Sequence, residues 1–225
     1  MIDLRDVTVT FPDADSVVCA LDRVTFQASS RELVVLAGAS GSGKSTLLNV
    51  VAGLQPFEAG TAHVAGTDLA DADDAALALL RLVHVGVVFQ ENNLIREFDA
   101  AENVQLPLRA RGWSAVEANS EATAMLATVG LAGLERRRPA QLSGGQRQRV
   151  GIARALVGGR SVLVADEPTG ALDTTNSAAV FTLLRQLADS GVCVVVASHD
   201  TGAVAYADRV LHISDGALAA AAPAS

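Results

Sequence analysis

The chain of 225 residues contains only two cysteines, Cys19 and Cys193. They do not have the spacing of a zinc or iron–sulfur ligand set, which argues against a cysteine-bound metal module. Cys193 lies in an apolar run, where a small buried hydrophobic side chain fits. This sparse cysteine usage suits a reducing compartment such as the cytosol.

Positive charge is also scarce, because 17 Lys and Arg residues face 25 Asp and Glu residues and leave a net charge of −8 at pH 7. Proteins that bind nucleic acid neutralise its phosphates with Lys and Arg. We therefore expect no nucleic-acid partner, and any anion site must be local.

Long hydrophobic runs are missing too. No uncharged apolar run reaches the roughly 20 residues that span a bilayer, and residues 1–6 lack the apolar core of a signal peptide. The 50% of hydrophobic residues allows one domain with a sizeable core. If the protein works at a membrane, another component must hold it there.

The most informative stretch, residues 38–46, is rich in glycine and serine and lies between the apolar runs 33–36 and 47–51. This order predicts a strand, a tight loop and a helix, which a merely flexible turn would not explain. Glycines let backbone amides turn toward phosphates, and the helix N-terminus favours anions. We predict that Lys44 reaches the β- and γ-phosphates of a nucleotide and that Ser45 ligates Mg²⁺. The candidate nucleotide-binding residues are Gly38, Ser40, Gly41, Ser42, Gly43, Lys44, Ser45 and Thr46.

Apolar patterning predicts an α/β fold with two kinds of sheet. Residues 4–11 alternate like a half-exposed strand, and residues 18–26 supply its partners in a small N-terminal antiparallel sheet. The apolar runs 85–89, 162–165 and 192–197 are typical of buried strands in a parallel sheet.

Between residues 91 and 158 the alternation of strands and helices gives way to helices alone. We predict an inserted α-helical subdomain at 91–158, within a single domain whose nucleotide-binding core comprises 1–90 and 159–225. Residues 114–117 have the pattern of a capping box that opens one of these helices. Residues 210–213 alternate again and predict a closing edge strand.

Four polar residues follow the predicted buried strands. Gln90 follows the first strand, and Asp166 and Glu167 follow the second; His199 comes after the third. Ligands bind at the carboxyl ends of strands in open parallel sheets. We predict that one of the adjacent carboxylates Asp166 and Glu167 organises Mg²⁺ and that the other orients a water molecule. A strand-end turn and a solvated histidine are the ordinary alternatives, and the nearby phosphate loop favours the functional interpretation.

A second glycine-rich stretch, residues 142–149, predicts a capped helix. Ser143 is placed as its N-cap, so Gly144, Gly145 and Gln146 would offer free amides to an anion. Taken alone, the pattern favours the ordinary alternative, a capped helix with a glycine-rich start.

Over essentially its whole length the chain resembles the nucleotide-binding subunit of ATP-binding cassette (ABC) transporters. The resemblance rests on the order of the loop 38–45, Gln90, the stretch 142–146, the pair Asp166–Glu167, the stretch 171–173 and His199. It implies a P-loop NTPase (RecA-like) sheet core, ATP as the nucleotide, and Mg²⁺ held by Ser45, Gln90 and Asp166.

The resemblance also implies roles for single residues. From the sequence alone Phe11 is either a core aromatic or a ring that stacks on adenine, and it matches the adenine-stacking position, where the family more often has Tyr. Gln90 matches the residue that senses the γ-phosphate and Mg²⁺. Glu167 matches the general base, and His199 matches a γ-phosphate contact. Asp173 matches a residue at the seam between two subunits.

The family pattern further implies a homodimer, or a heterodimer with a related subunit. In such a pair, Ser143, Gly145 and Gln146 of one subunit would close over the ATP held by the glycine-rich loop of the other. Reopening after hydrolysis would be the work stroke.

Residues 87–90, 102–104 and 165–173 resemble the group that includes lipoprotein-release and macrolide-export ATPases. We expect an ATPase that lies peripherally on the cytoplasmic face of the cell membrane and drives a separate permease, which docks near Gln90–Phe98 and exports or extracts a substrate. The alternative is a mechanical ATPase that regulates a cell-wall or sensor complex without transport. A chromosome-associated cassette would need long coiled-coil or zinc insertions, which the sequence lacks.

Overall fold

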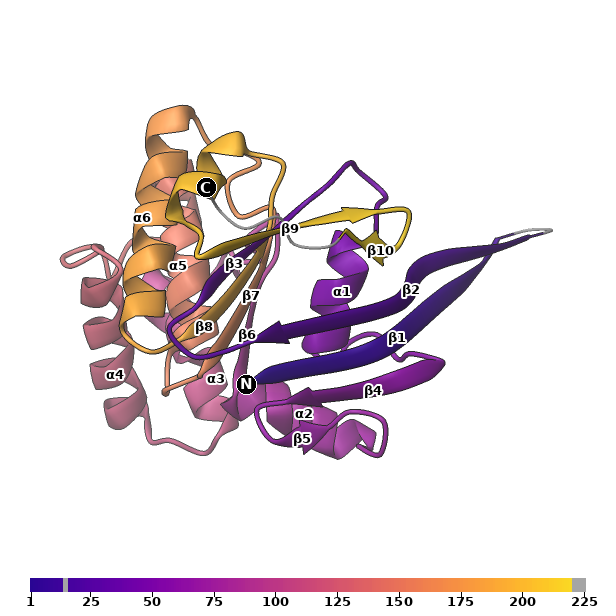
Figure 1. Ribbon diagram of the computed structural model, residues 1–225. Helices are drawn as coiled ribbons and strands as arrows, with labels where there is room; N and C mark the ends of the chain where they lie inside the picture. The colour runs from indigo at the N-terminus through magenta and orange to yellow at the C-terminus, as the bar shows by residue number, and fades with distance from the viewer. Residues whose placement is uncertain (14–15, 220–225) are drawn as a thin grey trace.

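The computed structural model describes residues 1–13 and 16–219, and its strands form two sheets (Figure 1). The antiparallel sheet has the order β2-β1-β4-β5, with strands at Ile2–Asp13 (β1), Ser16–Ala28 (β2), Ala59–Val64 (β4) and Thr67–Asp68 (β5). The second sheet has the order β10-β9-β3-β8-β7-β6, with strands at Leu33–Ala37 (β3), Val85–Val88 (β6), Val162–Asp166 (β7), Cys193–Ala197 (β8), Arg209–Ser214 (β9) and Ala217–Leu218 (β10). Its strands are parallel except for β10. The predicted α/β fold is confirmed.

Helices cover both faces of the parallel sheet. They are α1 (Lys44–Val51), α2 (Asp74–Val83), α3 (Ala100–Ala110), α4 (Ala115–Thr128), α5 (Gly144–Leu156) and α6 (Thr174–Asp189), with 3₁₀ turns at Pro139–Gln141 and Thr201–Tyr206. Figure 1 shows α5 and α6 along one face, and α1 with the antiparallel sheet on the other. Between β6 and β7 the chain contains the helices α3, α4 and α5 and the 3₁₀ turn at Pro139–Gln141, with no strand.

The central strand β3 divides the hydrophobic interior into two cores. Leu33 and Val35 pack in a core shared with α3, α4, α5 and α6. Val34 and Leu36 point the other way, into a core shared with α1 and the antiparallel sheet. Successive strand residues face opposite sides, so a strand covered on both faces must be apolar throughout. This explains why the run 33–36 does not alternate.

Parallel pairing brings the carboxyl ends of four strands to one edge of the sheet. Val35 of β3 and Ala165 of β7 both pair with Val196 of β8, and Val88 of β6 pairs with Ala165. The loops that leave β3, β6, β7 and β8 therefore begin side by side. This register positions the site described below.

Two strand predictions need correction. The run 85–89 was expected to be buried throughout, but β6 ends at Val88 and Phe89 is exposed, because the chain leaves the sheet there toward α3. Residues 210–213 were expected to form an edge strand. Instead β9 lies between β3 and β10, because the chain turns back at Gly216, where φ is +77°, and pairs Leu218 with Ile213.

Phe181 of α6 is the residue whose truncation should most affect stability on the helical face. Its ring is buried and stacks on Tyr206 with the ring centroids 5.8 Å apart. We expect Phe181→Ala to lower the free energy of unfolding by about 3–5 kcal/mol, because it removes buried area and leaves a cavity. Urea denaturation followed by circular dichroism measures this. Val116→Ala, at an exposed position on α4, is the control and should change stability by less than about 0.5 kcal/mol. An equal effect of the two substitutions would contradict the assignment of Phe181 to the core.

Candidate active site

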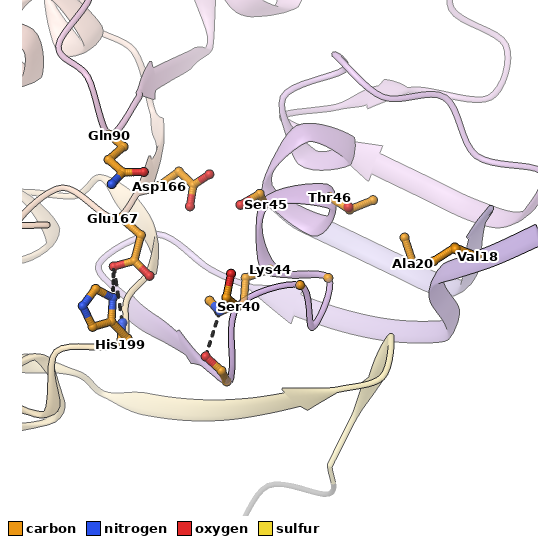
Figure 2. A pocket seen from close by; sticks show the side chains of 13 residues that line it. Val18, Ala20, Ser40, Lys44, Ser45, Thr46, Gln90, Asp166, Glu167 and His199 are labelled. Atoms are coloured by element: carbon orange, nitrogen blue, oxygen red, sulfur yellow. Dashed lines mark hydrogen bonds and ion pairs between the residues drawn. The ribbon is translucent and has the colours of Figure 1, made fainter. Parts of the chain in front are cut away.

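A cavity of about 440 Å³ opens at the carboxyl ends of β3, β6, β7 and β8 (Figure 2). It gathers segments that are far apart in the sequence. The lining residues are Val18, Ala20, Gly38, Ser40, Gly41, Gly43, Lys44, Ser45, Thr46, Gln90, Asp166, Glu167 and His199. The structure therefore brings the glycine-rich loop together with all four polar residues that the sequence placed at the strand ends.

The glycine-rich loop joins β3 directly to α1, whose first turn lines the cavity. Gly43 precedes the helix with φ of +108°, a conformation that side chains rarely adopt. A Cβ atom there would lie only 2.4 Å from the backbone oxygen of Ala20. Glycine is thus required at this position both by backbone conformation and by the close approach of β2. The free amides at the start of α1 face the cavity and favour a bound anion.

Lys44 is only 7% exposed, and its ammonium lies inside the loop. Nζ donates hydrogen bonds to the backbone oxygens of Gly38, at 2.8 Å, and Ala39, at 2.7 Å. Two of its three protons are engaged, and the third is left for an acceptor in the cavity. Ser42, which the sequence placed among the nucleotide-binding residues, does not line the cavity, and its Oγ is buried with no hydrogen-bond partner among the described residues. The buried ammonium and the helix amides fit a chain of phosphates.

Three oxygen-bearing side chains meet on the opposite side of the loop. Figure 2 shows the Ser45 hydroxyl directed toward Asp166, with Gln90 beside them. A hydroxyl, an amide oxygen and a carboxylate are the ligand types that Mg²⁺ takes, usually together with phosphate oxygens and water. These residues would hold the ion as the sequence predicted.

Glu167 and His199 form a pair at the wall of the cavity (Figure 2). His199 Nδ1 lies 2.8 Å from Glu167 Oε2, and the His199 backbone amide donates to the same oxygen at 3.4 Å. Glu167 adopts φ of +45°, in the left-handed region that is sparsely populated by residues other than glycine. Its amide donates to Ala197 O at 2.9 Å, which fixes the strained residue to the end of β8. Such strained positions occur often at functional sites.

The predicted second anion site is built differently from the expectation. Ser143 caps α5: its Oγ accepts from the Gln146 amide at 3.2 Å, and its own amide donates to Gln146 Oε1 at 2.9 Å. The Gln146 amide is therefore not free, which corrects the prediction. Ser143 is exposed, and Ser143, Gly145 and Gln146 do not line the cavity of their own chain.

Phe11 also lies outside the cavity lining. It is 38% exposed on β1, paired with Val18 of β2. Val18 and Ala20, which do line the cavity, were assigned from the sequence only as strand residues. One sequence feature could have identified them as cavity residues: they lie on the strand expected to pair with the strand of Phe11, the predicted adenine-stacking residue.

The comparisons with known proteins agree with this geometry. A protein-family model described as "ABC transporter" matches residues 21–170. The chain belongs to the ABC transporter family. It is an ATP-binding cassette with the P-loop fold and the ATPase activity of that family, for which the cofactors are ATP and Mg²⁺.

The chain is also similar to individual named proteins. The chain is 42% identical over 224 residues to a protein of Shigella boydii named macrolide export ATP-binding/permease protein MacB, covering all of this chain and 35% of that protein. The corresponding protein of Chromobacterium violaceum is 42% identical over 217 residues, with 96% and 34% covered. The chain thus spans about a third of the length of these curated relatives. The predicted resemblance to macrolide-export ATPases is confirmed.

Two solved structures of the cassette MJ0796 superpose over nearly the whole chain. One, described as a dimer of a bacterial ABC transporter cassette, has a TM-score of 0.90 at 36% identity, covering 99% of this chain and 98% of that chain. The other, a dimeric post-hydrolysis state bound to ADP and Pi, has the same TM-score at 35% identity and the same coverage.

Proposed function

We propose that this cassette pairs with a second cassette, of the same or a related sequence, closes over ATP, and reopens after hydrolysis to drive a membrane permease that exports a substrate. The observation that best supports this proposal is that a single chain contains only part of the proposed ATP site. Its cavity gathers the phosphate loop and the catalytic pair, whereas the exposed Ser143 tip of α5 lies elsewhere on the surface. A head-to-tail pair brings that tip onto the partner's loop, and similar cassettes are dimeric.

Each residue of the cavity has a task in this proposal. Lys44 and the loop amides bind and orient the phosphates. Ser45, Gln90 and Asp166 hold Mg²⁺, which supplies positive charge against the β- and γ-phosphate oxygens. Glu167 accepts a proton from the attacking water, and His199 orients Glu167 and faces the γ-phosphate. Phe11 stacks on adenine from the tip of β1.

The permease is proposed to dock at a groove of about 450 Å³ beside Gln90–Phe98. Its apolar lining includes Leu54, Val87, Phe89, Leu106 and Pro107. The described residues include no helix that is long and apolar enough to cross a bilayer. The relatives are named ATP-binding/permease proteins, so a permease on the same or another polypeptide would hold the cassette at the cytoplasmic face.

In this proposal the two parts of the domain have different roles. We assign residues 1–90 and 159–225 to the nucleotide-binding core and residues 91–158 to the helical subdomain, with Gln90 at their junction. Because α5 starts at the tip that meets the partner, the helical subdomain carries the closing surface. The permease, rather than the cassette, contacts the substrate.

The test uses ATP-dependent pairing. In a chain carrying Glu167→Gln to slow hydrolysis, MgATP should shift the 23.1 kDa monomer to a dimer on size exclusion with light scattering. Adding Ser143→Glu should abolish the dimer, because the new carboxylate faces the partner's phosphates. ATP affinity of the monomer should stay within about threefold, since Ser143 lies outside its own cavity.

Ser114→Glu is the matched control. Ser114 caps α4 with the same geometry as Ser143, its Oγ accepting from the Glu117 amide at 3.2 Å. The two substitutions alter equivalent caps, and Ser114→Glu should leave the dimer intact. A Ser143→Glu chain that still pairs with ATP, or a Ser114→Glu chain that does not, would contradict the proposed interface.

A further inference from the structure

Arg154 joins helix α5 to the segment that follows Gln90. Nη1 donates to Asn93 O at 2.8 Å and Nη2 donates to Asn92 O at 2.7 Å. Two nitrogens of one guanidinium thus donate hydrogen bonds to two consecutive backbone carbonyls. These contacts span 61 and 62 residues of sequence and connect the segment that leaves the edge of the sheet to α5, the helix that Ser143 caps.

The gripped segment links the cavity to the helical subdomain. Gln90 at its start lines the cavity. At its far end the buried Asn103 of α3 accepts from the Ile95 amide at 2.8 Å and donates to Ile95 O at 3.1 Å. Arg154 holds the middle. Along the chain from Gln90, the Arg154 contacts at residues 92 and 93 thus come before the Asn103 contact that leads to α3.

The chemistry of this contact is specific to arginine. Among the described residues no carboxylate lies within ion-pair distance of Arg154. Burial lowers the pKa of its guanidinium, which still carries its charge at neutral pH. Hydrogen bonds from a charged donor are stronger than those between neutral groups, and the planar fork fixes their direction. A lysine has no such fork and holds at most one of these carbonyls in the same geometry.

The packing around the contact contains strained and unpaired groups. Asn93 adopts φ of +46°, in the left-handed region. Asn92 Oδ1, which lies against Gly151 of α5, is buried with no hydrogen-bond partner among the described residues. Buried polar groups normally find partners.

We infer that Arg154 is a positioning residue that couples Gln90 to the closing tip of α5. When Gln90 engages the nucleotide site, the segment moves and the guanidinium carries α5 with it, presenting Ser143 to the partner's loop. The inference rests on the proposed function, because it assigns the coupling that closure requires. Arg154 also lines the groove proposed for the permease, so a partner seated there touches the same link.

The test is a double-mutant cycle on ATP turnover of the purified protein at saturating MgATP. Arg154→Lys should lower kcat about tenfold in the parent chain. In a chain that also carries Gln90→Ala, the same substitution should lower kcat less than twofold. Without the Gln90 side chain, Arg154 has no movement to transmit to α5. ATP affinity of the monomer should stay within about twofold in Arg154→Lys, since Arg154 does not line the nucleotide cavity.

Arg160→Lys is the structural control. Arg160 is buried, and its Nη1 donates to the backbone oxygens of Ala155 and Val157 at the end of α5. It should lower the melting temperature at least as much as Arg154→Lys, and its effect on kcat should be the same with and without Gln90. A second variant, Asn93→Gly, keeps Arg154 and loosens the segment at a position where positive φ suits glycine. It should lower kcat in the same direction by about threefold.

The outcomes separate the two proposals. If the parent hydrolyses ATP but the Arg154→Lys and Gln90→Ala losses multiply, or Asn93→Gly leaves kcat unchanged, the coupling is overturned and the proposed function stands. If the parent releases no phosphate from ATP, both are overturned. The coupling is supported if the kcat losses of Arg154→Lys and Gln90→Ala do not multiply, whereas those of Arg160→Lys and Gln90→Ala do.

Discussion

Replacing Glu167 by glutamine is expected to lower ATP turnover by a factor of about 10²–10⁴ while leaving ATP affinity within about threefold. The amide keeps the shape of the carboxylate but cannot accept a proton from water, and general-base catalysis contributes about that factor. Affinity should persist because the phosphates are held by Lys44 and the loop amides. Glutamine Oε1 can also still accept from the His199 amide.

Phosphate release at saturating MgATP and isothermal titration calorimetry measure the two effects of Glu167→Gln separately. Glu117→Gln is the matched control: Glu117 accepts from the Ser114 amide at 3.0 Å in the cap of α4, far from the cavity, and glutamine serves equally in such a cap. Its turnover should equal that of the parent. Turnover in Glu167→Gln within about threefold of the parent would remove Glu167 from the role of base.

The catalytic edge could be predicted from sequence because its residues obey a local rule. Each of Gln90, Asp166 and His199 follows a continuous apolar run, and parallel strands place their carboxyl ends at one edge. The six-stranded order shows β8 beside both β3 and β7, and β7 beside β6, so the three residues converge on the loop. Spacing along the chain was sufficient, since no long-range side-chain contact decides this placement.

Features that depend on contacts between distant segments could not be predicted. The close approach of β2 to Gly43 depends on how the antiparallel sheet sits on α1. The grip of Arg154 on residues 92 and 93 joins two irregular or helical stretches with no periodic signal. The Gln146 amide was expected to be free, although the spacing of Ser143 and Gln146 is that of a capping box. In this chain each of the two side chains accepts from the other residue's backbone amide, as in the capping boxes at Ser114 and Asp99.

The loop side and the α5 side of the proposed site are held in place by different kinds of contact. The loop side is rigid: Lys44 is buried in its own loop, and Gly43 is confined by β2. The α5 side is joined to the sheet by side-chain hydrogen bonds onto an irregular segment. If the proposed function holds, a bound phosphate chain would add contacts to a loop that is already shaped, and the movement needed for closure would fall on the segment 91–158.

Replacing Lys44 by alanine should weaken MgATP binding about 10- to 100-fold, because hydrogen bonds to charged groups contribute about 1.5–3 kcal/mol. The loss extends beyond one contact: Nζ also holds Gly38 O and Ala39 O, so its removal frees the loop that shapes the cradle. Isothermal titration calorimetry with MgATP measures the change, and circular dichroism verifies the fold. Arg136→Ala, which removes an exposed cation, controls for net charge and should bind normally.

Lys44 is the only lysine of the chain, so selective ¹⁵N-lysine labelling gives a single backbone amide signal, at the first residue of α1. In the parent this signal should shift on titration with MgATP and yield the same Kd as calorimetry, because the helix N-terminus faces the phosphates. Normal ATP affinity in Lys44→Ala, together with an unmoved signal in the parent, would show that the nucleotide binds elsewhere. The cavity at the strand ends would then lose its function as the phosphate site.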